Sequence, residues 1–359
     1  MQMFALIADA VIILTLAVIV LSVFAVLSRY LSDLRERRIR QIRERMQGRL
    51  DEFLADSADA KAIIHELSRD PDIALGVLIG AASKLSCDAR MPLRVLFEQF
   101  QFPQKETAGL RARRWTTRVR AATQLGYMSH DDAIPELVKA LEDDILDVRL
   151  AAAHALAQLG AVQAVRPILR SLALPAAWPL QRCTEILYGM GAQAIDPLLD
   201  FLKDQDPQDQ NPAVVVAVRV LGMLRARRAA PQVSDFLRST NPELRLNSAK
   251  ALGQMGDPQV VSALCTSLDD PVWEVRSAAA QALGRLGNPS AMPSLEKLLA
   301  DSAWWARFNA AESLFQLGQP GQNVLKQAMA GHPDTFARDI SRQILEEHGV
   351  IPMREVFST

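Results

Sequence analysis

Residues 275–287 read VRSAAAQALGRLG, and this stretch decides the fold. Its apolar residues recur three or four positions apart, as they do on one face of an α-helix: Val275, Ala279, Ala282, Leu283 and Leu286. Gly287 follows directly, and glycine readily adopts the left-handed conformation that ends a helix. The stretch therefore predicts an amphipathic helix closed by a glycine.

The same pattern recurs along the chain at a fixed interval, and each copy ends in a glycine. These glycines are Gly256, Gly287, Gly318 and Gly349, and we call the number of residues from one of them to the next the repeat step. An arginine stands 11 residues before each of them, at Arg245, Arg276, Arg307 and Arg338, and Arg149 stands 11 residues before Gly160. Two columns that keep the same register define an internal repeat.

A second apolar stripe follows each glycine. In the quoted repeat it comes after a turn with Pro289 and comprises Ala291, Met292, Leu295, Leu298 and Leu299. The same layout holds at residues 133–141, 164–172 and 194–202. Each repeat is thus a helical hairpin, and because a lone hairpin cannot cover its own apolar face, the hairpins must stack. We predict an all-α superhelix of about seven to eight hairpins.

Taken together, V-R-x-x-A-A-x-x-L-x-x-L-G followed by A-x-P-x-L-x-x-x-L-x-D resembles the short bacterial HEAT repeats of the phycobilisome-lyase type. The resemblance covers residues 115–349. It implies a HEAT-like solenoid, and in that family some members attach bilin chromophores and others excise damaged bases from DNA. A bilin lyase-like enzyme or a DNA glycosylase-like protein is therefore the alternative to a binding scaffold.

Four positions depart from the pattern. Arg225 stands in place of the glycine in the fourth repeat, Leu180 and Val214 in place of the arginine, and we expect Trp115 in place of the arginine in the first repeat. These positions predict a bend in the superhelix or a cap at its end.

The remaining segments complete five predicted parts of the chain. Residues 1–29 are a transmembrane anchor, 30–56 a basic amphipathic juxtamembrane helix, 57–112 degenerate N-terminal helical repeats, 113–349 the HEAT-like repeats and 350–359 a C-terminal tail.

The anchor is predicted from the stretch between Phe4 and Ser28, which is apolar apart from Asp9. Its 19 uncharged residues, 10–28, span roughly 28 Å as a helix, close to the thickness of a bilayer core. The basic residues all follow it, so the rule that basic flanks stay in the cytoplasm predicts an outside N-terminus. We expect a single-pass protein of the bacterial inner membrane with its solenoid in the cytoplasm.

Eight arginines crowd the segment behind this stretch and give residues 29–49 a charge of +5, whereas residues 50–359 carry −5. They are Arg29, Arg35, Arg37, Arg38, Arg40, Arg43, Arg45 and Arg49. Apolar residues from Leu31 to Phe53 recur at helical spacing among them. The segment either lies on anionic lipid, pairs with a copy of itself, or simply flanks the anchor with solvated charges.

The ladder arginines, Arg149, Arg245, Arg276, Arg307 and Arg338, suggest either an anion site or a structural pairing. Asp143, Asp270 and Asp301 stand six residues before three of them. Regularly spaced opposite charges favour Asp–Arg pairs between neighbouring loops of a stack.

Catalysis finds little support in the residue pattern. The histidines, His65, His130, His154, His332 and His348, share no spacing, and the sequence has no H-E-x-x-H, Walker or dinucleotide motif. His130, Asp131 and Asp132 form a turn and helix cap more readily than a metal site. Cys87, Cys183 and Cys265 lie far apart in apolar patterns typical of buried thiols. We predict no enzyme activity, catalytic residue, metal or cofactor.

We expect equivalent residues of successive second helices to form one exposed column, whose charge bears on nucleic-acid binding. The column consists of Lys139, Arg170, Asp200, Asp235, Thr266 and Lys297. Its charges alternate in sign, whereas a groove for phosphates needs one sign along its length. We therefore expect neither a nucleic-acid partner nor a small-molecule substrate.

Tryptophans supply the candidate contact residues for a protein partner. Trp273 and Trp304 are separated by one repeat step, Trp305 is adjacent, and Trp178 lies near the matching position of an earlier repeat. Either they form a docking edge, because tryptophan is enriched at binding hot spots, or each ring packs between adjacent repeats. We expect a scaffold that binds a partner at the cytoplasmic face of the membrane, in an envelope or polysaccharide-synthesis complex.

Overall fold

The computed structural model describes residues 2–55, 60–86, 88–173, 179–208 and 210–352, with the backbone alone for residues 2–19, 60 and 88. These residues form helices joined by turns and contain no β-strand, which confirms the predicted all-α class. The chain divides into two compact units. Unit 1 is Met1–Ala108 with Tyr127–His130, and unit 2 is Gly109–Gly126 with Asp131–Thr359. The bounds predicted for the other four parts of the chain, residues 30–56, 57–112, 113–349 and 350–359, stay predictions.

Unit 1 is built on one long helix. Its helices are α1 (Gln2–Leu54), α2 (Ala60–Leu67), α3 (Pro71–Ala82), α4 (Met91–Gln99) and α5 (Phe102–Gly109). The C-terminal part of α1 packs against α2 and α3 and buries Met46 and Leu50. These two residues belong to the predicted amphipathic stripe, whereas Leu31 and Leu34 of that stripe are exposed.

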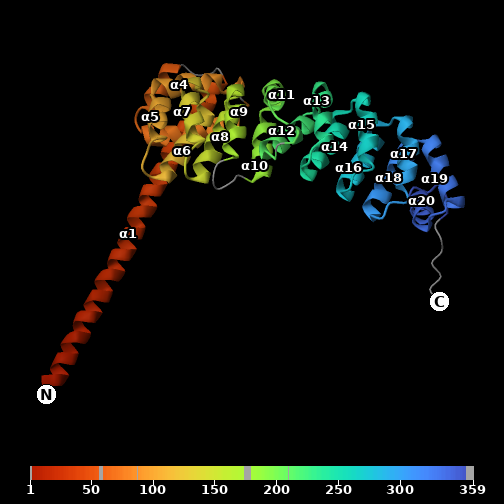
Figure 1. Ribbon diagram of the computed structural model, residues 1–359. Coiled ribbons are helices and arrows are strands. Elements are labelled where there is room, and N and C mark those ends of the chain that lie inside the picture. Colours follow the sequence, from red (N-terminus) through yellow and green to blue (C-terminus); the bar gives the residue numbers. More distant parts are fainter. Residues whose placement is uncertain (1, 56–59, 87, 174–178, 209, 353–359) are drawn as a thin grey trace. The chain divides into compact units, whose positions relative to one another are not determined.

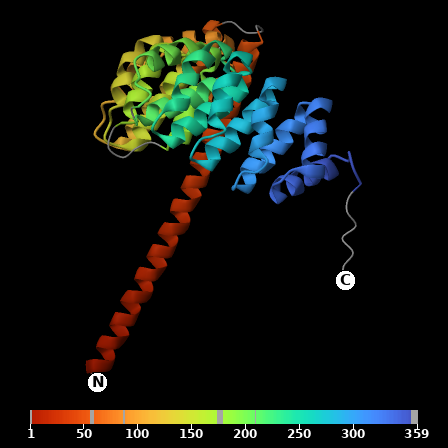
Figure 2. The same ribbon diagram turned by 45° about the vertical axis from the view of Figure 1, so that its right-hand side comes forward.

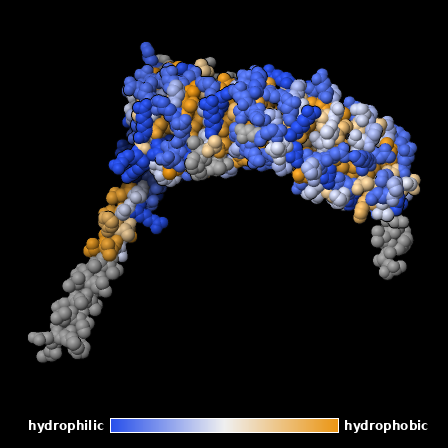
Figure 3. All heavy atoms as spheres, in the orientation of Figure 1, coloured by the Kyte–Doolittle hydropathy of each residue, from blue (hydrophilic) through white to orange (hydrophobic). Residues whose placement is uncertain are grey.

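The predicted membrane anchor requires a correction. No helix of the described residues is both long and apolar enough to cross a bilayer, so the prediction of a single-pass inner-membrane protein is wrong. Among the described side chains of α1, the uncharged stretch before Arg29 comprises only residues 20–28. This is far shorter than the ~20 apolar residues that a membrane span needs. The preceding side chains, in residues 2–19, lie outside the described part. Figure 3 shows the apolar stretch of α1 beside the grey atoms.

Unit 2 contains the repeats, and its helices follow one another in chain order (Figures 1 and 2). The first helices of the hairpins are α6 (Trp115–Met128), α8 (Leu146–Gln158), α10 (Leu180–Gly189), α12 (Pro212–Met223), α14 (Pro242–Met255), α16 (Trp273–Leu286), α18 (Trp304–Gln316) and α20 (Thr335–Glu347). The second helices are α7 (Ile134–Ala140), α9 (Val165–Ser171), α11 (Ile195–Lys203), α13 (Ala230–Asp235), α15 (Val261–Ser267), α17 (Met292–Leu298) and α19 (Gln319–Gly331).

Stacking buries the stripe that the sequence predicts. In α16, Val275, Ala279 and Leu283 are fully buried, and the helix packs against α14 and α18. The packing is close because small residues meet there: a Cβ placed on Gly253 of α14 would lie 2.8 Å from the Cβ of Ala282. Contacts run between neighbouring hairpins, as in other solenoids, so each repeat completes the core of the next.

The first helices are followed by a residue with positive φ. This φ is 66° at Gly160, 72° at Gly256, 65° at Gly287 and 68° at Gly349. Gly318 also has a positive φ of 77°, but its ψ of −153° lies outside the left-handed helical region. Gly191, Ser129 and Arg225 occupy the same place in their repeats with φ of 69°, 52° and 51°. The turn geometry is therefore kept where glycine is absent, although a side chain makes that conformation costly.

We expect Arg225→Gly to raise the free energy of unfolding by up to about 1 kcal/mol, because glycine relieves the left-handed strain at this helix end. Arg225→Ala keeps a Cβ and is the matched control, with no gain expected. Urea denaturation followed by circular dichroism measures both. Equal stability of the two variants would contradict the strain argument.

Candidate functional site

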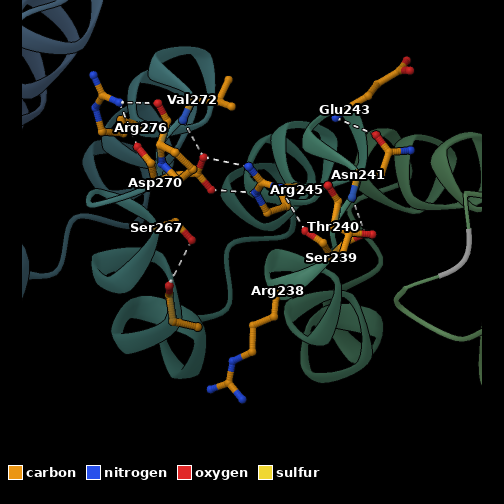
Figure 4. A network of polar contacts seen from close by, with 12 residues as sticks. Arg238, Ser239, Thr240, Asn241, Glu243, Arg245, Ser267, Asp270, Val272 and Arg276 are labelled. Atoms are coloured by element: carbon orange, nitrogen blue, oxygen red, sulfur yellow. Dashed lines mark hydrogen bonds and ion pairs between the residues drawn. The ribbon is translucent and has the colours of Figure 1, made fainter.

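Asp270 joins two successive repeats through the loop that precedes α16 (Figure 4). Its carboxylate accepts hydrogen bonds from Nε and Nη2 of Arg245, at 2.7 and 2.9 Å, and from the backbone N–H of Val272 at 2.8 Å. Its backbone carbonyl accepts a hydrogen bond from Nη1 of Arg276 at 2.8 Å. One residue thus ties the start of α14 to the start of α16.

The same contacts recur in other repeats. Arg118 pairs with Asp143 at 2.7 and 2.8 Å, and Arg276 pairs with Asp301 at 2.6 and 2.7 Å, each across 25 residues. Asp143 and Asp301 also accept from the backbone N–H groups two residues on. We call these arginine and aspartate contacts the loop ladder. Planar two-bond pairing between guanidinium and carboxylate fixes orientation as well as distance.

Each ladder arginine also binds its own loop. Its Nη1 donates to the carbonyls six and five residues earlier, which holds for Arg118, Arg149, Arg245, Arg276, Arg307 and Arg338. Arg118 therefore occupies the ladder position of the first repeat, not Trp115 as predicted. The signal that the prediction missed is that Arg118 precedes Arg149 by one repeat step.

The ladder controls the ionisation of its own carboxylates. Burial by itself raises the pKa of Asp301, but the hydrogen bonds from Arg276 and from the Ala303 N–H outweigh it, so the pKa lies below the ordinary value. The pKa of Asp143 is lowered against burial in the same way by Arg118 and the Ile145 N–H. The hydrogen bonds that Arg276 donates to Asp301 raise the pKa of Arg276. These loops are stabilised in the ionised form.

We expect Asp301→Asn to lower the free energy of unfolding at pH 7 by roughly 1.5 to 3 kcal/mol, since a charge-assisted pair is lost. A lowered folded-state pKa means that this stabilisation is present above about pH 4 and disappears as pH falls through the folded pKa. Urea titrations from pH 7 to pH 3 should therefore show the two proteins converging in acid. Asp269→Asn, on an exposed carboxylate paired with Lys297, is the control and should change little; equal losses from both variants would refute the ladder's role.

An aromatic edge lies at the N-terminal ends of three first helices. We give this name to Trp273, Trp304, Trp305, Phe308 and Phe336. Trp304 packs edge to face with Trp305 at 4.7 Å between ring centroids, and it stacks on Phe308 at 5.0 Å. The guanidinium of Arg307 lies 4.6 Å from the ring centre of Phe336. The exposed fractions of Trp273, Trp305 and Phe336 are 39%, 54% and 56%.

A groove of 240 Å³ crosses this edge between α16 and α18. Trp273 and Trp305 line it together with Lys250, Glu274 and Asn309. Its floor is tied across the repeats, because Asn309 Nδ2 donates to Ser277 Oγ at 2.6 Å. Large rings over a fixed polar floor are the kind of surface on which a protein partner finds a hot spot.

The sequence pattern predicts only part of this edge. Trp273, Trp304 and Trp305 belong to it, whereas Trp178 lies outside the described residues. Phe336 and Phe308 were missed, although Phe336 follows Trp305 by one repeat step. The role of these residues as partner contacts stays a prediction.

The other predicted sites lie elsewhere. The eight arginines from Arg29 to Arg49 are exposed along α1 in unit 1, and Arg45 pairs with Glu66 at 2.8 Å. The column from Lys139 to Lys297 is exposed on the second helices. Lys139 contacts Glu136, Lys297 contacts Asp269, and Asp200 contacts Lys203, each at 2.7 Å. These three charges of the column thus have a partner of opposite sign.

Two of the cysteines fit the prediction of thiols in apolar surroundings. Cys183 is fully buried, and burial raises its pKa to about 12. Cys265 is half-buried, and burial raises its pKa as well. Cys87 lies outside the described residues. Within the described part of the chain, His, Cys, Asp and Glu form no group that could hold a metal ion.

Solved structures with a similar fold have low sequence identity. A Kap121p mutant is 12% identical with a TM-score of 0.54, over 81% of this chain and 38% of that chain. An engineered protein is 18% identical with a TM-score of 0.40, over 85% and 94%. The complex of CpcE and CpcF of phycocyanin lyase from Nostoc sp. PCC7120 is 20% identical with a TM-score of 0.31, over 68% and 94%. No curated protein matches the sequence.

The repeats themselves are recognised in the sequence. A model described as HEAT repeats matches residues 107–188, 195–284 and 263–346, which together exceed half of the chain. This match agrees with the stacked hairpins of unit 2 and with the solenoid fold shared with Kap121p. The chain belongs to the HEAT-repeat family.

Proposed function

We propose that the protein is a binding scaffold whose solenoid docks a partner protein on the aromatic edge. The observation that carries this proposal is the exposure of Trp273, Trp304 and Trp305 at 39%, 42% and 54%. A ring that only filled space between repeats would be buried, whereas these rings leave much of their surface to solvent. Tryptophan supplies a large contact area at low entropic cost, which is why it dominates hot spots.

The supporting scaffold is stiff at this place. Arg276 and Asp301 tie α16 to the loop before α18, and Arg307 holds Phe336 through its ring face. A preorganised surface loses less conformational entropy on binding than a mobile one does. The aromatic rings are thus presented on positions that the loop ladder fixes.

A scaffold is also the common use of HEAT repeats, since stacked hairpins give a long continuous surface for a partner protein. The proposal places no membrane in this role. The lyase activity of the CpcE and CpcF complex belongs to that protein, and a TM-score of 0.31 carries no inference to this chain.

Site-specific photocross-linking in the source cells tests the proposal. Replacing Phe336 by p-benzoylphenylalanine keeps an aromatic ring on the edge, and we expect it to give a discrete cross-linked product. The matched control places the same group at Thr266, which is exposed on the second helix α15 and should give no such product.

We expect Trp305→Ala, introduced together with the photoreactive group at position 336, to abolish the product. Loss of a hot-spot ring costs about 2 kcal/mol or more, close to a thirtyfold loss of affinity. Because Trp305 is 54% exposed, the urea midpoint should barely change, which separates lost binding from lost folding. An undiminished product in the Trp305→Ala protein would reject the aromatic edge as the docking site.

A further inference from the structure

The last loop of the ladder carries a histidine where the two preceding loops carry an aspartate. Asp270, Asp301 and His332 follow one another at intervals of one repeat step. His332 precedes α20, as Asp270 precedes α16 and Asp301 precedes α18. In the last loop an imidazole therefore occupies the position of a ladder carboxylate.

His332 makes part of the contacts of that carboxylate. Its Nδ1 accepts a hydrogen bond from the backbone N–H of Asp334 at 3.1 Å, just as Asp301 accepts from the Ala303 N–H at 2.7 Å. Its backbone carbonyl accepts from Nη1 of Arg338, as the carbonyl of Asp301 accepts from Arg307. An accepting Nδ1 carries no proton, so this turn is made by the neutral ring.

The third contact of the ladder carboxylate, its pair with the arginine of the preceding repeat, needs a negative charge, which an imidazole lacks. In the preceding repeat Arg276 binds the carboxylate of Asp301, but Arg307 lies against the Phe336 ring instead. The charged groups around the loop are Arg307 from α18 and Asp334 and Arg338 from α20. Asp334 already caps α20 by accepting from the Ala337 N–H at 3.0 Å.

We propose that His332 is a pH-sensitive joint that loosens α20 when the imidazole takes up a proton. A protonated Nδ1 is a donor and faces the donating N–H of Asp334, so the turn loses its hydrogen bond. The new positive charge also joins two arginines. Histidine is the side chain whose charge ordinarily changes between pH 5 and 8.

The direction of the effect follows from which state the folded loop prefers. The folded turn uses Nδ1 of His332 as an acceptor, and this hydrogen bond is lost when that nitrogen carries a proton. The start of α20 is therefore held more firmly at pH 7.5 than at pH 5.5. Since α20 carries Phe336, a fall in pH also loosens one end of the aromatic edge. This consequence for partner binding rests on the proposed function, whereas the role of His332 in holding α20 does not.

Hydrogen exchange of the intact protein tests the joint without any partner. Protection factors, corrected for the intrinsic rate at each pH, are measured by mass spectrometry at pH 7.5 and 5.5. We expect the protection of α20 to fall roughly three- to tenfold between them, as the loss of one hydrogen bond implies. The protection of α16, whose loop carries Asp270, should not fall.

Two variants at the same position decide the cause. His332→Asn keeps a neutral acceptor, and His332→Asp restores the residue of the earlier repeats; both should abolish the fall at pH 5.5. With Asp, Arg307 also regains a carboxylate, so protection at pH 7.5 should rise. His332→Asn with the same pH dependence as the natural protein would overturn the proposal.

The second histidine of this repeat needs a control of its own. His348 Nε2 contacts Glu312 at 2.9 Å and its ring stacks on Phe315, so this residue is a second imidazole in contact with α18. His348→Gln removes that imidazole. The fall in α20 protection should persist or grow in that variant, and its disappearance would assign the effect to His348 and overturn the role of His332.

Discussion

The paired hydrogen bonds between an arginine and an aspartate 25 residues further on are the contact on which the rest of unit 2 depends. Apolar stripes bring hairpins together, but they do not choose a rotation, because alanine and leucine tolerate sliding. A planar two-bond contact tolerates very little. With Arg276 tied to Asp301 and to the carbonyl of Asp270, two loops and two helices share one orientation. The positions of Trp304 and Trp305, which begin the helix after Asp301, follow from it.

Periodicity explains how far the sequence alone could go. Spacing predicted the hairpins and the left-handed glycines, because a repeated fold repeats its backbone requirements. Spacing did not predict the backbone conformation where the residue type changes. Arg225 has a positive φ, which favours glycine, and an arginine at this position gives no indication of that conformation. The predicted membrane anchor is wrong for another reason, since no helix of the described residues is both long and apolar enough to cross a bilayer.

The aromatic edge shows the same division between register and surroundings. Register placed Trp273 and Trp304 at equivalent positions, but it did not predict their exposed fractions of 39% and 42%. The exposure of a side chain depends on its three-dimensional neighbours, so the spacing within one repeat does not reveal it. Phe336 was missed because its role rests on Arg307, which lies over its ring, and a cation–aromatic contact leaves no spacing signature beyond the repeat step.

The fixed offsets between neighbours also set how the chain can change in length. Removing residues 257–287 would bring Arg245 to the same offset from Asp301 that it now has from Asp270, and Gly253 would meet Ser313 instead of Ala282. Asn288 would take over from Asp257 as the cap of the following turn. Loss or duplication of a segment that is not a whole number of repeat steps would break the offset at once. Such a chain gains and loses surface only in complete hairpins, and a gene for it can evolve by unequal crossing-over of whole repeats.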